Sequence, residues 1–239
     1  DQIPGSAFFW SSTMQGKDLV RLVLPDTLKS IGDHAFYGCK YLSGSLIIPE
    51  GVEEIQMGAF NNCTGLNGTL SLPTTLKYLG TKGNDPNKET ADEGNDYYGG
   101  VFQNCSGLVG ELILPDNLEL IRGYCFNGCN GLTSELRLPD KLRRLGNCAF
   151  SGCEGLTGSL SIPQEIQVIP SEAFNGCGFD GTLQLHDGIT NIGNNAFSGC
   201  HFKGELVLPK YLSVIANEAF YANDFSGVLK IPSGITAIG

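Results

Sequence analysis

Hydrophobic residues recur along this chain with a nearly constant period. A phenylalanine, usually preceded by alanine, returns every 23 or 24 residues from Phe36 to Phe220, except for one step of 42 that contains an insertion of 18 residues. One repeat reads G-x-L-x-(L/I)-P-x-x-(L/I/V)-x-x-(L/I)-G-x-x-A-F-x-G-C. Self-similarity at a period of about 20 to 50 residues is typical of repeat proteins, so the chain is expected to form a solenoid.

Each repeat predicts one half-buried strand and one compact turn. In the L-x-(L/I) segment the apolar residues alternate with other residues, which is the pattern of a strand with one buried face. Proline follows this segment in eight of its nine copies and is expected to end the strand. After a second short extended piece, A-F-x-G-C predicts a turn whose last glycine has positive φ; Asn62 and Asn104, which tolerate that conformation, replace it in two repeats. The predicted strands begin at Leu22, Leu46, Leu70, Leu112, Leu136, Leu160, Leu183, Leu206 and Leu229.

A single repeat of this size cannot bury its own apolar face, so the repeats must stack. We therefore predict a β-rich solenoid of about nine coils with a parallel sheet, a single domain over residues 1–239. In the late repeats Phe179, Phe202 and Phe225 replace a leucine and are expected to reach the same core position from a loop one residue shorter. The expected core columns are Phe36, Phe60, Phe102, Phe126, Phe150, Phe174, Phe197 and Phe220, with Cys39, Cys63, Cys105, Cys129, Cys153, Cys177 and Cys200.

Composition and motifs exclude several classes of function. With 15 Lys and Arg against 25 Asp and Glu the formal net charge is −10, which argues against a nucleic-acid-binding protein. Hydrophobic residues make up 41% of the chain, too many for a disordered protein, yet no apolar run is long enough to span a membrane. No phosphate-binding loop, dinucleotide motif or zinc spacing occurs among these residues. We therefore predict no cofactor, no metal and no catalytic activity.

The nine cysteines are an odd number, and seven of them share one repeat position. A disulfide framework needs partners at varied spacings, and no C-x-x-C pair occurs. The pattern favours a ladder of buried thiols that pack as small hydrophobic side chains. Metal binding and redox chemistry are the alternatives for this column.

Residues 31–39, IGDHAFYGC, followed by residues 46–49, LIIP, resemble the repeat of the BspA-like leucine-rich repeat family. The match recurs about nine times in register and extends over residues 3–239 apart from the insertion. The resemblance implies a leucine-rich repeat horseshoe, a right-handed superhelix with a parallel sheet. It also implies an extracellular or surface-attached bacterial protein with a role in adhesion or host-protein binding, and it brings no catalytic motif. The last full repeat departs from the pattern because Asn223 replaces its cysteine.

The insertion, within residues 81–100 of the third repeat, is the one long departure from the period. Its sequence, TKGNDPNKETADEGNDYYGG, is polar and acidic apart from a tyrosine pair. Insertions in repeat proteins often form the binding face, so Tyr97 and Tyr98 are candidate aromatic anchors, with Asp85, Asp92 and Asp96 as candidate polar contacts. A solvated loop without function is the alternative. A calcium site is a weaker alternative, because the calcium-binding loop pattern D-x-(D/N)-x-(D/N)-G is absent.

The outward positions of the predicted strands offer a second candidate surface, where Ile47, Ile113 and Arg137 lie among mixed neighbours without an aromatic stripe. We interpret the chain as a non-enzymatic scaffold that binds a protein, such as a host extracellular protein, on the cell surface or outside the cell. A glycan-binding module and a structural spacer in a larger surface protein are the alternatives. Because residues 235–239 stop just before the next A-F, we expect a longer array.

Overall fold

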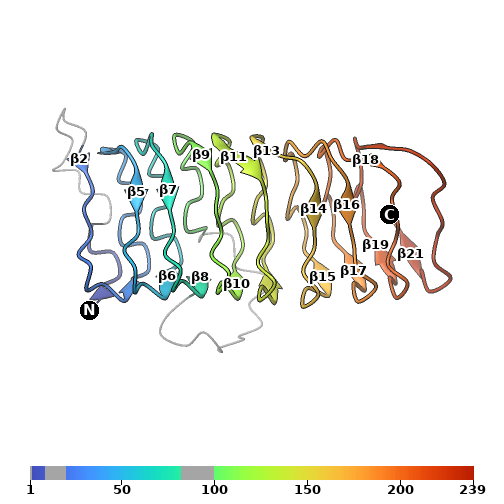
Figure 1. Ribbon diagram of the computed structural model, residues 1–239, viewed down its shortest axis with the longest axis horizontal. Coiled ribbons are helices and arrows are strands. Elements are labelled where there is room, and N and C mark those ends of the chain that lie inside the picture. The colour runs from blue at the N-terminus through green and yellow to red at the C-terminus, as the bar shows by residue number, and fades with distance from the viewer. Residues whose placement is uncertain (1, 9–19, 82–99) are drawn as a thin grey trace.

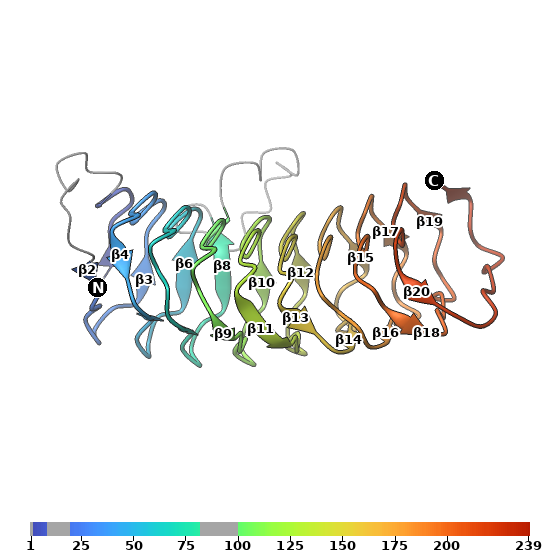
Figure 2. The same cartoon turned by 90° about the horizontal axis from the view of Figure 1, so that it is seen from above.

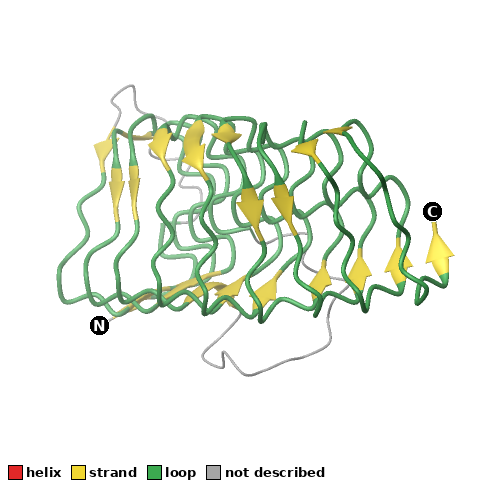
Figure 3. Cartoon of the chain, turned by 45° about the vertical axis from the view of Figure 1, so that its right-hand side comes forward, coloured by secondary structure: helices red, strands yellow, loops and turns green. Residues whose placement is uncertain are grey.

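The computed structural model describes residues 2–8, 20–81 and 100–239, and it confirms the predicted solenoid. About nine coils are stacked in one row, with the two ends of the chain at opposite ends of the row (Figure 1; Figure 2). The described residues contain no helix, and their short strands are joined by turns and extended segments (Figure 3). Each coil therefore packs mainly against the coil before it and the coil after it.

The longest run of paired strands lies along the lower edge of Figure 1. All strands in it are parallel, and equivalent residues of successive repeats face each other, as Ile31 faces Ile55. A six-stranded part contains β1 (Gln2–Ile3), β3 (Ser30–Ile31), β6 (Glu54–Gln56), β8 (Tyr78–Thr81), β10 (Leu120–Ile121) and β12 (Arg144–Leu145). A four-stranded part contains β15 (Val168–Ile169), β17 (Asn191–Ile192), β19 (Val214–Ile215) and β21 (Ala237–Ile238). Both parts together are called the main ladder below.

The main ladder corrects one detail of the prediction, because it uses the second extended piece of each repeat and not the L-x-(L/I) segment. The L-x-(L/I) segment forms strands only in two pairs, β5 (Leu46–Ile47) with β7 (Leu70–Ser71) and β14 (Leu160–Ser161) with β16 (Leu183–Gln184). The proline that follows eight of the nine L-x-(L/I) segments has no N–H group to continue a ladder there. The remaining short strands are β2 (Val20–Arg21), β4 (Leu42–Ser43), β9 (Gly110–Glu111), β11 (Leu132–Glu135), β13 (Leu156–Thr157), β18 (Lys203–Gly204) and β20 (Asp224–Phe225).

Stacked phenylalanine rings run through the interior from Phe36 to Phe220, as the repeat predicted, and the half-exposed Phe8 stacks on Phe36 at the start of the row. Neighbouring ring centroids are 5.1 Å apart between Phe36 and Phe60 and 5.6 Å apart between Phe150 and Phe174, with nearly parallel planes. All predicted members of the column are buried except Phe220, which is half-buried because it lies near the end of the row. The late-repeat ring of Phe179 is also buried and packs edge-on against Phe174 at 6.2 Å.

The cysteine column is reduced and buried, and it also forms hydrogen bonds, which the sequence did not predict. All nine cysteines are free and buried. The thiol of Cys153 donates to the carbonyl oxygen of Phe126 at 3.1 Å, and the other six members of the column make the same bond to the phenylalanine of the preceding coil. In the last coil the side-chain amide of Asn223 replaces the thiol and donates to the Phe197 carbonyl at 2.7 Å. Burial raises the pKa of the Cys153 and Cys200 thiols to about 12, so both remain protonated donors.

The A-F turns contain two left-handed positions. The predicted one is confirmed by Gly38 at φ 71°, with Asn62 and Asn104 both at φ 59°. A second, which the sequence did not reveal, precedes the A-F pair and is occupied by non-glycine residues such as His34 at φ 54° and Glu172 at φ 56°. Non-glycine residues adopt this conformation infrequently, so the surrounding coils must hold these turns in place.

Candidate functional site

The candidate residues of the insertion, Tyr97, Tyr98, Asp85, Asp92 and Asp96, lie outside the described residues. The described chain shows only where the insertion is attached. It leaves the main ladder at the end of β8 and rejoins the coil at residue 100. Its role in binding therefore stays a prediction.

The other predicted candidates lie on the face formed by the L-x-(L/I) segments. In these segments side chains alternate between core and solvent, so Leu46 is fully buried while its neighbour Ile47 is 55% exposed. At the same repeat position Val23 is 79% exposed and Ile113 is 66% exposed. We call Val23, Ile47 and Ile113 the apolar strip; Ser71 lies between the last two of them and is paired with Ile47 in the sheet.

Arg137 follows Ile113 at the same position in the next coil, and it lines a polar hollow of about 620 Å³. Three acidic side chains, Glu111, Glu135 and Asp140, line the same hollow together with Ser159 and Gln184. The structure thus brings the three described candidates, Ile47, Ile113 and Arg137, to one face. An apolar row bordered by polar and charged groups is the usual anatomy of a protein-binding surface.

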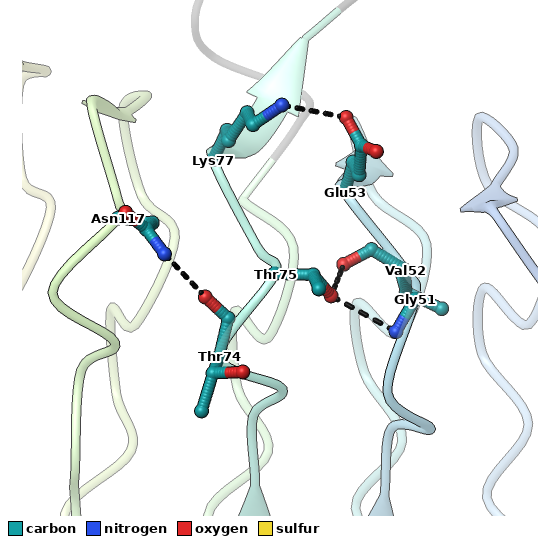
Figure 4. Close-up of polar contacts among 7 residues, drawn as sticks. All are labelled: Gly51, Val52, Glu53, Thr74, Thr75, Lys77 and Asn117. Atoms are coloured by element: carbon teal, nitrogen blue, oxygen red, sulfur yellow. Dashed lines mark hydrogen bonds and ion pairs between the residues drawn. The ribbon is translucent and has the colours of Figure 1, made fainter.

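Polar side chains connect successive coils at the corner between this face and the main ladder (Figure 4). Thr75 Oγ1 donates to the Val52 carbonyl at 2.8 Å and accepts from the Gly51 N–H at 3.0 Å, and Asn117 Nδ2 donates to the Thr74 carbonyl at 2.9 Å. Lys77 Nζ lies 2.8 Å from Glu53 Oε2, and this contact lowers the pKa of the Glu53 carboxyl. Both charged side chains are exposed, so the pair adds little stability. We interpret this corner as a device that keeps the coils in register.

A further candidate surface was missed by the sequence analysis. It is a groove of about 880 Å³ over the main ladder, located where the ladder is interrupted between β12 and β15. Arg122, Arg143 and Arg144 line it. One feature of the sequence could have revealed it: Pro170 stands where Gly32 and its equivalents stand in other repeats.

The described residues contain no group of three or more His, Cys, Asp or Glu side chains arranged to hold a metal ion. His186 Nε2 pairs with the Ile166 carbonyl at 3.0 Å and its Nδ1 accepts from the Gly188 N–H at 3.1 Å, so both ring nitrogens are used within the fold. The raised pKa of the buried thiols opposes a nucleophilic role for them. No helix in the described part of the chain is long and apolar enough to cross a membrane.

Several solved structures of leucine-rich repeat proteins are similar to this chain. Among solved structures, a leucine-rich repeat protein of T. pallidum is 23% identical, with 83% of this chain and 69% of that chain covered and a TM-score of 0.46. A leucine-rich cell surface protein of Faecalibacterium prausnitzii is 18% identical, with 98% and 78% covered and a TM-score of 0.46. A leucine-rich repeat protein of Bacteroides ovatus is 19% identical, with 92% and 74% covered and a TM-score of 0.39.

No curated protein sequence matches the chain. The family model for the BspA-type leucine-rich repeat region, in contrast, matches residues 3–83 and 97–226 in six copies. These residues make up most of the chain and include the repeats that build the phenylalanine column and the main ladder. The chain therefore belongs to the BspA-type leucine-rich repeat family.

Proposed function

We propose that this protein is a non-enzymatic scaffold that binds a partner protein through the apolar strip. The observation that carries the proposal is the row of branched apolar side chains at Val23, Ile47 and Ile113, each more than half exposed. Exposed apolar rows on monomeric proteins tend to mark interaction sites, because leaving such surface in water is unfavourable. Buried leucines next to these residues, Leu24, Leu46 and Leu112, hold the segments in place, so the strip is preorganised for binding.

The chemistry of this face favours a protein over a glycan. Sugar rings are commonly bound on exposed aromatic side chains, and neither the apolar strip nor the hollow beside it contains an aromatic residue. The exposed tyrosines of the described chain, Tyr211 and Tyr221, belong to the last repeats, several repeats further along the chain than Ile47. A pure spacer would need no exposed apolar row, so that alternative is also less favoured.

A location outside the cell or on its surface, an adhesin-like role and a host extracellular protein as the partner are further parts of the proposal. Membership of the BspA-type family supports them. The insertion is proposed as a second contact, in which Tyr97 and Tyr98 would supply aromatic anchors and Asp85, Asp92 and Asp96 polar contacts.

The test is an affinity screen of the purified protein against an array of extracellular matrix and serum proteins, with a glycan array in parallel. Each hit is measured again with the double variant Ile47→Asp/Ile113→Asp. Because two central contacts are lost, we expect the affinity to fall by about 30-fold or more. The matched control is Val207→Asp, which changes a 63% exposed residue at the same repeat position several coils away. Hits on glycans alone, or equal affinities for both variants, would contradict the proposal.

A further inference from the structure

Acidic side chains border the apolar strip on both sides. In each repeat the residue two places before a strip position also points outward, because core residues alternate with outward ones in this segment. The residue after the proline that ends the segment comes on the other side of the strip. We call these two sets the acidic rows: Glu111 and Glu135 before the strip, and Asp26, Glu50, Asp116 and Asp140 after it. All six are exposed, and Glu135 and Asp140 line one hollow together with Arg137, so both rows border the strip position of that coil.

Most of these carboxylates are not used within the fold. Among the described residues, no ion pair or hydrogen bond engages the carboxylates of Asp26, Glu111, Asp116, Glu135 and Asp140. Glu50 is the exception, because its carboxylate accepts from the Thr74 N–H at 3.1 Å and from Thr74 Oγ1 at 2.9 Å. At the corner towards the main ladder, in contrast, charges are paired between coils, as Lys77 is with Glu53 at 2.8 Å. The acidic rows therefore keep charge that a partner can neutralise.

Positive residues are few on this part of the face. At the strip position and in the two rows, the first five coils contain six acids against two bases, Arg21 and Arg137. The lysines that follow in these repeats, Lys29 and Lys141, come after the acidic position, on the way to the main ladder. The surface around the strip is therefore net negative. Such a surface repels nucleic acids and anionic lipid headgroups and attracts a basic partner.

The spacing of the coils favours a helix as the conformation of that partner. Ring centroids in the phenylalanine column put this spacing at 5.1 Å between Phe36 and Phe60 and at 5.7 Å between Phe60 and Phe102. An α-helix rises about 5.4 Å per turn, so a helix along the strip places one apolar side chain over each coil. An extended segment repeats at about 6.6 to 6.8 Å and loses this register. Its alternate residues also point away from the surface, whereas residues beside an apolar stripe on a helix reach to both sides.

We propose that the apolar strip binds a basic amphipathic helix of a partner protein. The apolar stripe of the helix packs on Val23, Ile47 and Ile113, and Lys or Arg on either side of the stripe reach the acidic rows. Ser71 has a shorter side chain than its neighbours in the strip, so a larger apolar residue of the helix fits there. Arg137 ends the strip and with it the apolar contact. This inference rests on the proposed function, because it takes the same strip as the contact surface and adds the class of partner.

The test is fluorescence anisotropy with a labelled peptide of about eighteen residues, or five helical turns. In this Lys peptide, Leu recurs at helical spacing, Lys flanks the Leu stripe on both sides, and Ala fills the remaining positions. Three peptides serve as comparisons: one with Glu in place of Lys, one with the same composition in scrambled order, and one with two central prolines that break the helix. We expect the Lys peptide to bind with an affinity that falls with added salt, and the other three to bind at least about ten-fold more weakly.

Two variants of the protein separate the charged and apolar parts of the site. Glu111→Gln/Asp116→Asn removes one carboxylate on each side of Ile113 and should weaken binding of the Lys peptide about five-fold or more. Its matched control, Glu154→Gln/Glu218→Gln, removes two exposed acids at other repeat positions and should change the affinity less than about two-fold. Ile47→Ser/Ile113→Ser copies the serine that stands at position 71 and should weaken binding about ten-fold or more, with Val207→Ser as its control.

Several results would overturn the basic helix. They are no binding of the Lys peptide up to about 1 mM, equal binding of any comparison peptide, and unchanged binding by either the acid variant or the serine variant. The proposed function fails separately. A partner from the affinity screen that is lost with Ile47→Asp/Ile113→Asp but unaffected by Glu111→Gln/Asp116→Asn would keep the strip as a binding surface and overturn only the basic helix. Partners unaffected by the isoleucine variants would overturn the proposed function itself.

Discussion

The hydrogen bonds of the cysteine column can be tested at Cys153, in the middle of the row. Its side chain is fully buried, and its thiol donates to the Phe126 carbonyl at 3.1 Å. Cys153→Ala removes the sulfur contacts and leaves a small cavity, which together cost about 1 to 2 kcal/mol. The lost hydrogen bond adds about 1 kcal/mol. The Phe126 carbonyl still accepts from the Cys129 N–H at 3.0 Å, so it is not left unpaired and the cost stays moderate. We expect a total of about 2 to 3 kcal/mol.

Cys153→Ser is the informative comparison, because serine has nearly the volume of alanine but retains a donor. If the thiol is important as a donor, the serine variant should be more stable than the alanine variant by about 1 kcal/mol. Urea unfolding followed by circular dichroism measures both free energies of unfolding, and an unchanged slope with urea would show that the same surface is exposed on unfolding. The pair should be repeated at Cys177, whose thiol makes the equivalent 3.1 Å bond to Phe150. A serine variant no more stable than the alanine variant at both positions would refute the hydrogen-bond role and leave the thiols as apolar filling.

Three further predictions follow from the same columns and from the insertion. Phe150→Ala should lower the free energy of unfolding, measured with urea, by about 3 to 5 kcal/mol. Phe220→Ala should lower it clearly less, because the half-buried terminal ring makes fewer contacts. Similar losses for the two variants would count against a stacked column. Burial raises the pKa of Cys153 and Cys200 to about 12, above the value near 9 of a free thiol. The contribution of these two buried thiols to the free energy of unfolding is therefore complete below about pH 9. It is lost as the pH rises towards 12, at about 1.4 kcal/mol per pH unit for each thiol. Thermal melts across this pH range would detect the loss as a falling Tm. Shortening Gly83–Tyr98 to two residues should leave the urea midpoint nearly unchanged, because loop-closure entropy varies slowly with length; a large loss would show that the insertion is part of the fold.

The fold was predictable because the repeat places the same residue type at the same position in every coil. Phe36 and its equivalents had to stack once the coils were in register, and the glycine before each cysteine had to adopt positive φ. The identity of the main ladder was not predictable in the same way. Both extended pieces of a repeat alternate apolar and polar residues, and only the hydrogen-bond partners show that Ile31 and Ile55, not Leu46 and Leu70, belong to the longer run.

Binding surfaces were harder to predict, because they depend on which residues of different coils become neighbours. Ile47 and Ile113 could be assigned to one face from the alternation within a strand. The thiol hydrogen bonds could not be inferred, since a buried cysteine column has the same sequence pattern whether or not its thiols donate. The replacement of Cys by Asn223 in the last coil was the available clue, because asparagine is a poor apolar filler but a good donor.

The residues that line the groove between β12 and β15 also become neighbours only through the register of the strands in the main ladder. Arg122 follows one strand of the main ladder and Arg144 lies within the next, and only the pairing of Leu120 with Arg144 brings them to one surface. If the ladder continued here, the Leu145 carbonyl would accept from the backbone of the next coil, as the Ile121 carbonyl accepts from the Gly146 N–H. Pro170 removes that pairing at the junction beside the arginines. A repeat protein can therefore form a groove by omitting one ladder bond, and a proline at a ladder position is the sequence pattern by which similar grooves could be sought in other solenoids.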